Sequence, residues 1–392
     1  MKRLLAGALT AGLVGSLGSL GHGVASADET VYTIGGAKMP GVPWYEYTDR
    51  SGRGYYPSTN RVLVDYPAGI FTDLLPKGEP GVGPSVQIGA NSLDELIHSS
   101  TGGPAVAVGL SEGSLVVNEE QARLLNDPNA PPPSQLSFAT FGDPAGRHGW
   151  GQSFLTSIFP PGTVIPLIDY AIPAPVETQY DTTRVVTAYD GISDFPDRPA
   201  NVVSLANALL GSIFYHTGVA FGNRGDVPPQ NIRTTVNSRG AKTITYLVPT
   251  QFLPLTFPLR MAGLPEETIV QLEAMLRPMV DAGYSRNDNP FTRPNAVDPV
   301  RGLPAITDTS SVVEANLDGF LGGIGLPGGG GDSLAGLAPM LEGVQLPQVN
   351  LPQVELPQVN PPQISPPEVN LDGVVQDAQK LLPPAESLLP RL

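Results

Sequence analysis

The chain has 392 residues, with 37 acidic against 22 basic side chains and a formal net charge of −15 at pH 7. A protein this acidic is a poor partner for nucleic acid, because its field repels the phosphate backbone. It contains no cysteine, which excludes disulfides, thiol nucleophiles and thiolate metal sites. Its stability must therefore come from an ordinary hydrophobic core.

Residues 1–27 have the features of a secretory signal peptide. Lys2 and Arg3 precede an apolar stretch that is too short and too interrupted by glycine to span a bilayer, and the stretch ends in Ala-Ser-Ala. We expect cleavage after Ala27, which removes two basic residues and brings the net charge to −17. The sequence thus predicts a protein that is secreted or held at the cell envelope.

Residues 28–299 alternate strand-like and helical patterns, as in an α/β domain with a central, mostly parallel sheet. Two segments between the strands have the apolar spacing of helices, and in the first of them Ser92 and Glu95 fit a capping box at its start. The expected strands cover 31–36, 61–69, 105–110, 135–144 and 183–191, and the two helices cover 92–100 and 114–125.

After residue 230 the pattern predicts a β-hairpin with its turn at 237–240. An apolar stretch split by prolines follows over 246–261 and suits the wall or lid of a lipid-binding site, although it could equally be plain core. Residues 265–284 then read as a helix, with proline at the start and two acids in the first turn.

From about residue 300 the composition changes. A glycine-rich linker precedes a five-residue repeat over 346–370, and every unit of the repeat contains proline. Such a sequence favours extended polyproline II conformation. We expect residues 300–392 to form a low-complexity tail that either associates with the cell envelope or has no binding role.

Residues 105–114, AVAVGLSEGS, place a buried-strand pattern directly before Gly-Leu-Ser-Glu-Gly. A strand, a serine and a helix in this order predict a nucleophile elbow, in which the flanking Gly109 and Gly113 leave room for the strained turn that presents Ser111. The alternative is a chance match in a chain that contains 45 glycines.

A serine becomes a nucleophile only beside a base, and in α/β-hydrolases the chain order is nucleophile, acid, histidine. His98 precedes Ser111, and His148 precedes the last expected parallel strand. His216 is therefore the expected base.

The acid that orients the histidine is expected in the segment after the strand over 183–191. Asp194 is favoured over Asp190, because Asp190 and the glycine after it also suit an ordinary tight turn. Asp197 could simply pair with its neighbour Arg198, and Asp143 is a more distant alternative.

An oxyanion hole requires two backbone N–H donors. One is expected from Glu112, the residue after the nucleophile, and the other from Ala37, which follows two glycines after the first strand. The alternative for this glycine-rich segment is a simple turn at a strand end.

Several segments together make the chain resemble the mycobacterial PE-PPE domain, a cutinase-like branch of the α/β-hydrolases. The matching segments lie within residues 30–290 and are GGAKMPG, VDYPAG, VGLSEGSLV, FGDPAG, YDGISDFPDRPANVVSLANALLG, FYHTGV and YLVPTQFLPLTFPLR. The resemblance implies an α/β-hydrolase fold and a serine hydrolase or acyltransferase that needs no cofactor or metal. It assigns the triad to Ser111, Asp194 and His216.

The chain departs from the family at the residue after the nucleophile, where members usually carry glutamine and this chain has Glu112. A carboxylate there would oppose a developing oxyanion unless it points away or stays protonated. With its signal peptide, the chain is similar to the family's envelope acyltransferases of trehalose lipids.

We therefore expect a secreted serine esterase or lipase that acts on acyl esters or glycolipids through an acyl-enzyme. One alternative is an acyltransferase that moves fatty acyl chains onto trehalose-type glycolipids. Another is a non-catalytic envelope-binding protein built on the same fold.

Overall fold

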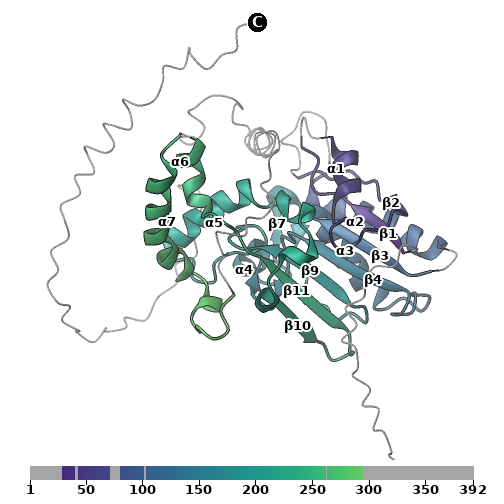
Figure 1. Ribbon diagram of the computed structural model, residues 1–392. Helices are drawn as coiled ribbons and strands as arrows, with labels where there is room; N and C mark the ends of the chain where they lie inside the picture. Colours follow the sequence, from purple (N-terminus) through teal and green to yellow (C-terminus); the bar gives the residue numbers. More distant parts are fainter. Residues whose placement is uncertain (1–28, 40–42, 71–79, 101–102, 262, 295–392) are drawn as a thin grey trace, which may run out of the picture.

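The computed structural model describes residues 29–39, 43–70, 80–100, 103–261 and 263–294 (Figure 1). The predicted signal peptide over 1–27 and the predicted tail over 300–392 lie outside the described residues. None of the helices within these ranges is long and apolar enough to cross a membrane.

A seven-stranded sheet lies at the centre, with strand order β10-β11-β9-β4-β3-β1-β2 (Figure 1). All neighbouring strands pair in parallel except β10 and β11, which form the predicted antiparallel hairpin at one edge. The strands are β1 Thr30–Ile34, β2 Arg61–Leu63, β3 Ala105–Leu110, β4 Leu136–Phe141, β9 Thr182–Thr187, β10 Ile232–Val236 and β11 Lys242–Val248. Two small hairpins pair β5 Arg147–His148 with β6 Gly151–Gln152 and β7 Val164–Ile165 with β8 Tyr170–Ala171.

Helices flank this sheet, and the mostly parallel arrangement confirms the predicted α/β-hydrolase fold. The helices are α1 Trp44–Arg50, α2 Val82–Ser99, α3 Glu112–Leu124, α4 Phe154–Ile158, α5 Val202–Phe214, α6 Phe257–Met261 and α7 Glu266–Asp281. Short 3-10 turns include η2 Thr217–Phe221 and η5 Pro254–Thr256.

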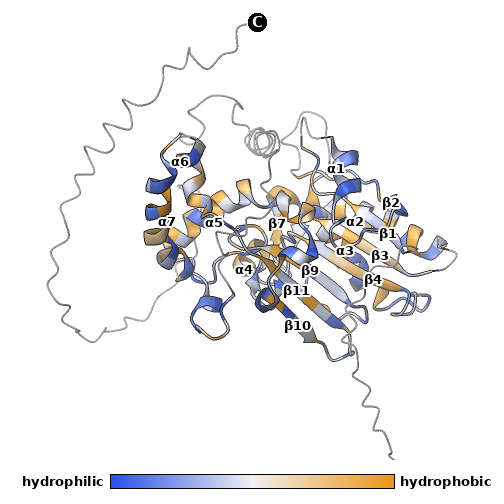
Figure 2. Ribbon diagram, viewed as in Figure 1, coloured by the Kyte–Doolittle hydropathy of each residue, from blue (hydrophilic) through white to orange (hydrophobic). Residues whose placement is uncertain are grey.

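Strand β3 shows why these residues form the centre of the sheet. All six of its residues are buried, as expected for a parallel strand covered on both faces. Ala105 and Ala107 pack into the core beneath α2 and α3, whereas Val106 and Val108 pack into a second core on the opposite face. Figure 2 shows the same pattern as hydrophobic central strands.

The prediction for the helix before β3 was wrong at its start. α2 begins at Val82, ten residues before the predicted cap, so Ser92 lies inside the helix and makes no capping box. Residues 82–91 are also helical, because Val86 and Ala90 continue the buried helix face that includes Leu93.

Strand β9 is shorter than predicted, because it ends at Thr187 and the chain turns at Tyr189, whose φ is 66°. This positive φ is uncommon for a residue with a side chain. The turn places the next residues beyond the carboxyl end of the sheet, the edge at which α/β proteins bind ligands.

Helices α5, α6 and α7 lie together beside the sheet (Figure 1). α5 and α7 pack with β9 and β11 in a third core, which includes Val186, Leu247, Leu253 and Val280. The proline-split segment predicted over 246–261 thus contributes the end of β11, η5 and α6 to this helical lobe.

Candidate active site

Ser111 occupies a sharp turn between β3, which ends at Leu110, and α3, which begins at Glu112. Its backbone has φ 52° and ψ −118°, a strained conformation for a residue with a side chain. A Cβ on Gly109 would collide with the backbone of Gly113, and a Cβ on Gly113 would collide with the backbone at the end of β1. The geometry is therefore that of a nucleophile elbow, and it requires glycine on both sides of the serine.

His216 lies over this serine, just after α5. Its Nε2 is 2.8 Å from Ser111 Oγ, and its Nδ1 is 2.8 Å from Asp190 Oδ2. His216 is 5% exposed and Asp190 is fully buried. A hydroxyl, an imidazole and a carboxylate in this series form a charge-relay geometry in which the acid fixes the imidazole tautomer.

The acid at this position is Asp190 and not the favoured Asp194. Besides His216, Asp190 Oδ2 accepts a hydrogen bond from the Ser193 hydroxyl at 2.5 Å, and Oδ1 accepts one from the Ile192 backbone N–H at 2.9 Å. These donors hold the carboxylate plane toward the imidazole. The turn that the sequence assigned to Asp190 and Gly191 therefore exists, and the same turn delivers the acid.

Asp194 faces the other side of this turn. Both of its oxygens bond to the Arg286 guanidinium, at 2.5 and 2.7 Å, and one of them also accepts the Tyr189 backbone N–H at 2.7 Å. Burial raises the pKa of Asp194 above its ordinary value, and Arg286 and the Tyr189 amide oppose this shift. Asp194 thus supports the turn at Tyr189 from behind, and its carboxylate has no contact with His216.

The remaining candidates lie elsewhere. Asp143 accepts hydrogen bonds from Arg184 at 3.0 Å and from Asn118 at 2.8 Å. His98 lies on α2, with its Nε2 2.7 Å from Asp127. His148 is in β5, and its side chain is outside the described set.

Sequence reasoning also missed residues that shape the site. Gly142 has φ 63°, and a Cβ there would lie 3.0 Å from His216 Cε1. Glycine at this strand end therefore gives the imidazole its space. The sequence interpretation considered only Asp143 in this Gly-Asp-Pro segment. Gly142, a glycine at the end of an expected strand, was the signal that could have been used.

The segment after β1 lies against the nucleophile, as the predicted oxyanion hole requires. A Cβ on Gly36 would lie 3.0 Å from Ser111 Cβ. Three hydrogen bonds fix the backbone here. They run from Trp44 Nε1 to Gly36 O at 2.7 Å, from the Tyr66 hydroxyl to Gly35 O at 2.7 Å, and from Lys38 N to Ala68 O at 2.8 Å.

The two expected oxyanion donors, the backbone N–H groups of Ala37 and Glu112, follow directly after Gly36 and Ser111. Within the described chain neither N–H donates to a protein acceptor. Glu112 is also the first residue of α3, where helix N–H groups carry partial positive charge. An anion beside Ser111 Oγ would meet this end of the helix.

The Glu112 side chain is 4% exposed, and neither carboxyl oxygen has a hydrogen-bond partner. Burial raises the pKa of this carboxyl well above its ordinary value, and Lys38 opposes the shift only in part. Burial thus favours the protonated, neutral form of the Glu112 carboxyl, the form that would not repel an oxyanion.

Aromatic rings form a cluster at the end of α5, in the chain segment that leads into His216. Phe214 of α5 and Phe257 of α6 stack with their centroids 4.8 Å apart, and Phe257 also meets Tyr215 at 5.4 Å and Phe252 at 6.4 Å. The cluster offers apolar surface, and its member Phe214 lies two positions before His216 in the sequence. In the described ranges, no group of three or more His, Asp or Glu is placed to hold a metal ion.

Comparison with known proteins places these residues in context. The model of the PE-PPE domain matches residues 57–285. The diacyltrehalose acyltransferase Chp2 of Mycobacterium tuberculosis is 51% identical over 364 residues, which cover 84% of this chain and 100% of Chp2. The SL1278 acyltransferase Chp1 of the same organism is 42% identical over 317 residues, covering 78% of this chain and 76% of Chp1.

The esterase PE16 of Mycobacterium tuberculosis is more distant, with 33% identity over 248 residues, which cover 60% of this chain and 46% of PE16. No solved structure matches the chain. The similar proteins thus include both acyl-transferring and ester-hydrolysing enzymes.

Proposed function

Because this chain belongs to the PE-PPE domain family, we propose that it transfers an acyl chain from an acyl ester to a hydroxyl group of a trehalose glycolipid. It is an enzyme of ester chemistry, and Ser111 is its nucleophile. The observation that carries the proposal is the hydrogen-bonded series from Ser111 Oγ through His216 to Asp190, with 2.8 Å at each step.

The first half-reaction forms an acyl-enzyme. His216 Nε2 accepts the Ser111 proton while Oγ attacks the ester carbonyl carbon, and the carbonyl electrons move onto the oxygen. The C–O bond to the leaving alcohol then breaks, and the imidazolium returns its proton to that alcohol. Asp190 stabilises the imidazolium throughout, because its carboxylate is buried and already oriented.

The oxyanion of each tetrahedral intermediate is bound by the backbone N–H groups of Glu112 and Ala37. Such donors stabilise a transition state by about 3 kcal/mol each, provided that they are fixed before the reaction. The hydrogen bonds that tie Gly35, Gly36 and Lys38 to neighbouring segments supply this fixed geometry.

The second half-reaction decides between transfer and hydrolysis. A sugar hydroxyl gives its proton to His216 and attacks the acyl-enzyme, which releases Ser111 and leaves the acyl group on the sugar. Two acyltransferases, one of them named for diacyltrehalose, match this chain over longer stretches and at higher identity than the esterase PE16. This supports transfer as the main reaction and hydrolysis as the competing one.

The acyl chain is held by the aromatic cluster around Phe257. Its rings contact Phe257, and two of them, Phe214 and Tyr215, directly precede His216 in the sequence, whereas Phe252 and Phe257 come from the segment between β11 and η5 and from α6. Apolar surface at this position is suited to a long hydrocarbon chain.

We propose, from the N-terminal sequence alone, that the reaction takes place outside the cytoplasm. The signal-peptide features of residues 1–27 support export. N-terminal sequencing of the exported protein is expected to begin at Asp28. A protein that retains Met1 after export would contradict this assignment.

Two experiments test the proposed function. A fluorophosphonate probe should label the wild-type protein and not Ser111→Ala, and a folded wild-type protein that resists labelling would favour a non-catalytic role. Incubation with a p-nitrophenyl acyl ester, with and without trehalose or an acylated trehalose, should give acylated sugar as the main product. Free fatty acid as the only product would make the enzyme a hydrolase.

A further inference from the structure

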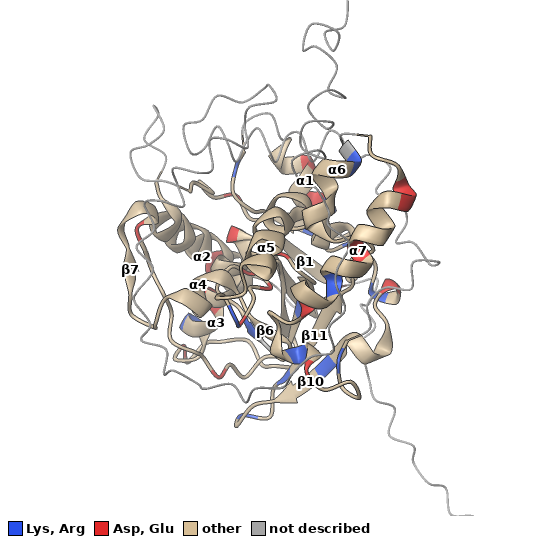
Figure 3. Cartoon of the chain, turned by 90° about the vertical axis from the view of Figure 1, so that its left-hand side faces the viewer, with Lys and Arg blue, Asp and Glu red and all other residues tan. Residues whose placement is uncertain are grey.

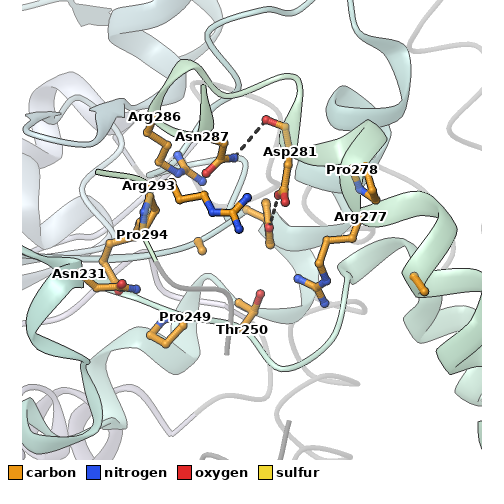
Figure 4. A pocket seen from close by; sticks show the side chains of 14 residues that line it. Asn231, Pro249, Thr250, Arg277, Pro278, Asp281, Arg286, Asn287, Arg293 and Pro294 are labelled. Atoms are coloured by element: carbon orange, nitrogen blue, oxygen red, sulfur yellow. Dashed lines mark hydrogen bonds between the residues drawn. The ribbon is translucent and has the colours of Figure 1, made fainter. Parts of the chain in front are cut away.

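Beyond the carboxyl ends of β9 and β11 lies a cavity of about 410 Å³, a volume within the usual range for small-molecule sites. Its walls are the turn after β9, the segment after β11, the C-terminal half of α7 and the segment 286–294 (Figure 4). Tyr189 lines this cavity, and the next residue, Asp190, contacts His216. The cavity therefore adjoins the proposed catalytic centre through a single turn.

The lining carries more positive than negative charge, although the protein has a net charge of −15. Arg277, Arg286 and Arg293 face one carboxylate, Asp281. Figure 4 shows Arg277 and Arg293 extending toward the cavity from opposite sides, and Figure 3 shows basic residues gathering near β10, β11 and α7. The guanidinium groups thus converge on the enclosed space.

These arginines differ in how many of their N–H donors already bond to other protein groups. Arg286 is committed to Asp194. Arg277 makes two long contacts of 3.3 Å, to Glu273 and to the Gln251 backbone oxygen. Arg293 has no ion pair or side-chain hydrogen bond to any described residue. Donor capacity is therefore left over for a ligand on both sides of the cavity.

Thr250 gives an independent sign of a missing ligand. It is 2% exposed, its hydroxyl has no hydrogen-bond partner, and Figure 4 shows the hydroxyl directed into the cavity. An unpaired buried hydroxyl costs about 1–3 kcal/mol. A polar ligand in the cavity would supply the absent partner.

We propose that this cavity binds the sugar headgroup of the glycolipid substrate, an inference that rests on the proposed function. Sugar hydroxyls both donate and accept hydrogen bonds, so they can donate to Asp281 and accept from Arg277 and Arg293. Asp281, whose Oδ1 already accepts the Tyr189 hydroxyl at 2.6 Å, is an acceptor that a sugar hydroxyl can use and a fully ionised anion cannot. The mixed lining therefore fits a neutral polyhydroxylated group better than a phosphate.

The position of the cavity suits a headgroup whose acyl esters are processed at Ser111. Only β4 separates β9 from β3 in the sheet, and neighbouring strands lie about 4.8 Å apart. The carboxyl ends of β9 and β3 are thus about 10 Å apart across the sheet. A disaccharide anchored beside β9 is held at the same sheet edge as the nucleophile.

Trehalose binding to the Ser111→Ala protein, measured by isothermal titration calorimetry, tests this site without turnover. In that background, Arg293→Ala should weaken trehalose binding by about tenfold, and Thr250→Val by about fivefold, as loss of hydrogen bonds of these types predicts. Arg239→Ala, at an exposed arginine in the β10–β11 turn, is the matched control and should bind as tightly as the parent.

The same variants with Ser111 intact should need correspondingly more trehalose for half-maximal acyl transfer. Trehalose binding that is absent, or that neither cavity substitution weakens, would overturn the site. Phosphate binding that depends on Arg293 in a protein that does not bind trehalose would also overturn it. Failure of fluorophosphonate labelling at Ser111 would refute the proposed catalysis, whereas trehalose binding to Ser111→Ala protein is measured independently of it.

Discussion

Replacing Asp190 with asparagine removes the negative charge that faces His216 while nearly preserving the side chain's shape. Asp190 Oδ2 lies 2.8 Å from His216 Nδ1 in a fully buried position. When His216 becomes an imidazolium in the transition state, this carboxylate attracts it by about 6 kcal/mol at an effective dielectric constant of about 20. Since about 1.36 kcal/mol corresponds to a factor of ten in rate, Asp190→Asn should lower kcat by about 10³- to 10⁴-fold.

Asp194→Asn should behave differently, because Asp194 contacts Arg286 and not the histidine. Removing its charge leaves a buried guanidinium without a partner, and breaking a buried ion pair in this way costs about 3–5 kcal/mol of stability. The hydrogen bonds among Ser111, His216 and Asp190 do not involve Asp194. The variant should unfold at a lower temperature, while its folded molecules lose less than about a hundredfold in kcat.

The assay combines p-nitrophenyl butyrate turnover with circular dichroism melting and fluorophosphonate titration, so that activity is expressed per folded site. The double variant Asp194→Asn with Arg286→Gln is the control, because it removes both charges and should recover part of the lost stability. Equal losses of kcat per folded site in Asp190→Asn and Asp194→Asn would refute the reasoning. A near-wild-type Asp190→Asn enzyme would exclude Asp190 as the triad acid.

Three further predictions concern buried groups near the site or in the core. Burial raises the pKa of Glu112, so Glu112→Gln should leave activity at pH 7 within about twofold, whereas wild-type activity should fall on the alkaline side as this buried carboxyl, on the residue after the nucleophile, ionises; identical pH–rate profiles from pH 6 to 10 would contradict this. Burial raises the pKa of Glu120 from 4.5 to about 8. The folded protein therefore holds this proton more tightly than the unfolded chain, and the Glu120 contribution to stability is lost as the pH rises from 4.5 to about 8. Glu120→Gln should raise the melting temperature more at pH 8 than at pH 5, and an equal change at both would count against it. Phe257→Ala should lower kcat/KM about tenfold more for a sixteen-carbon than for a two-carbon p-nitrophenyl ester, since it removes a large apolar contact surface; equal losses would place the acyl chain elsewhere.

The sheet could be predicted from the sequence because buried parallel strands leave a plain signal. The apolar run over 105–110 coincides with β3, and the hairpin after residue 230 is present as β10 and β11. Such runs are short, rich in small or β-branched residues and bounded by turn residues. The start of α2 was missed because its first turns contain glycine and proline, which usually mark loops, while tertiary burial of Val86 and Ala90 keeps them helical.

Ser111 and His216 were accessible to sequence reasoning for different reasons. The serine is surrounded by local requirements, a strand before it, a helix after it and two glycines where a Cβ would meet the backbone. The histidine followed from chain order and from the scarcity of histidine, of which the chain has 4. Neither argument needs the direction of a side chain, and so neither depends on three-dimensional detail.

The choice between Asp190 and Asp194 does depend on direction, and this is why the sequence could not settle it. Both carboxylates are fully buried, and both accept hydrogen bonds from the backbone of the same turn. Asp190 faces His216, and Asp194 faces Arg286. Which one faces the histidine follows from the positive φ of Tyr189, whose backbone N–H points to Asp194. Nothing local in the sequence predicts that φ, because Tyr189 is a residue type that rarely adopts it. The partner that holds Asp194 away from His216 is Arg286, 92 residues later in the chain. The identity of the triad acid is therefore a tertiary property of the fold.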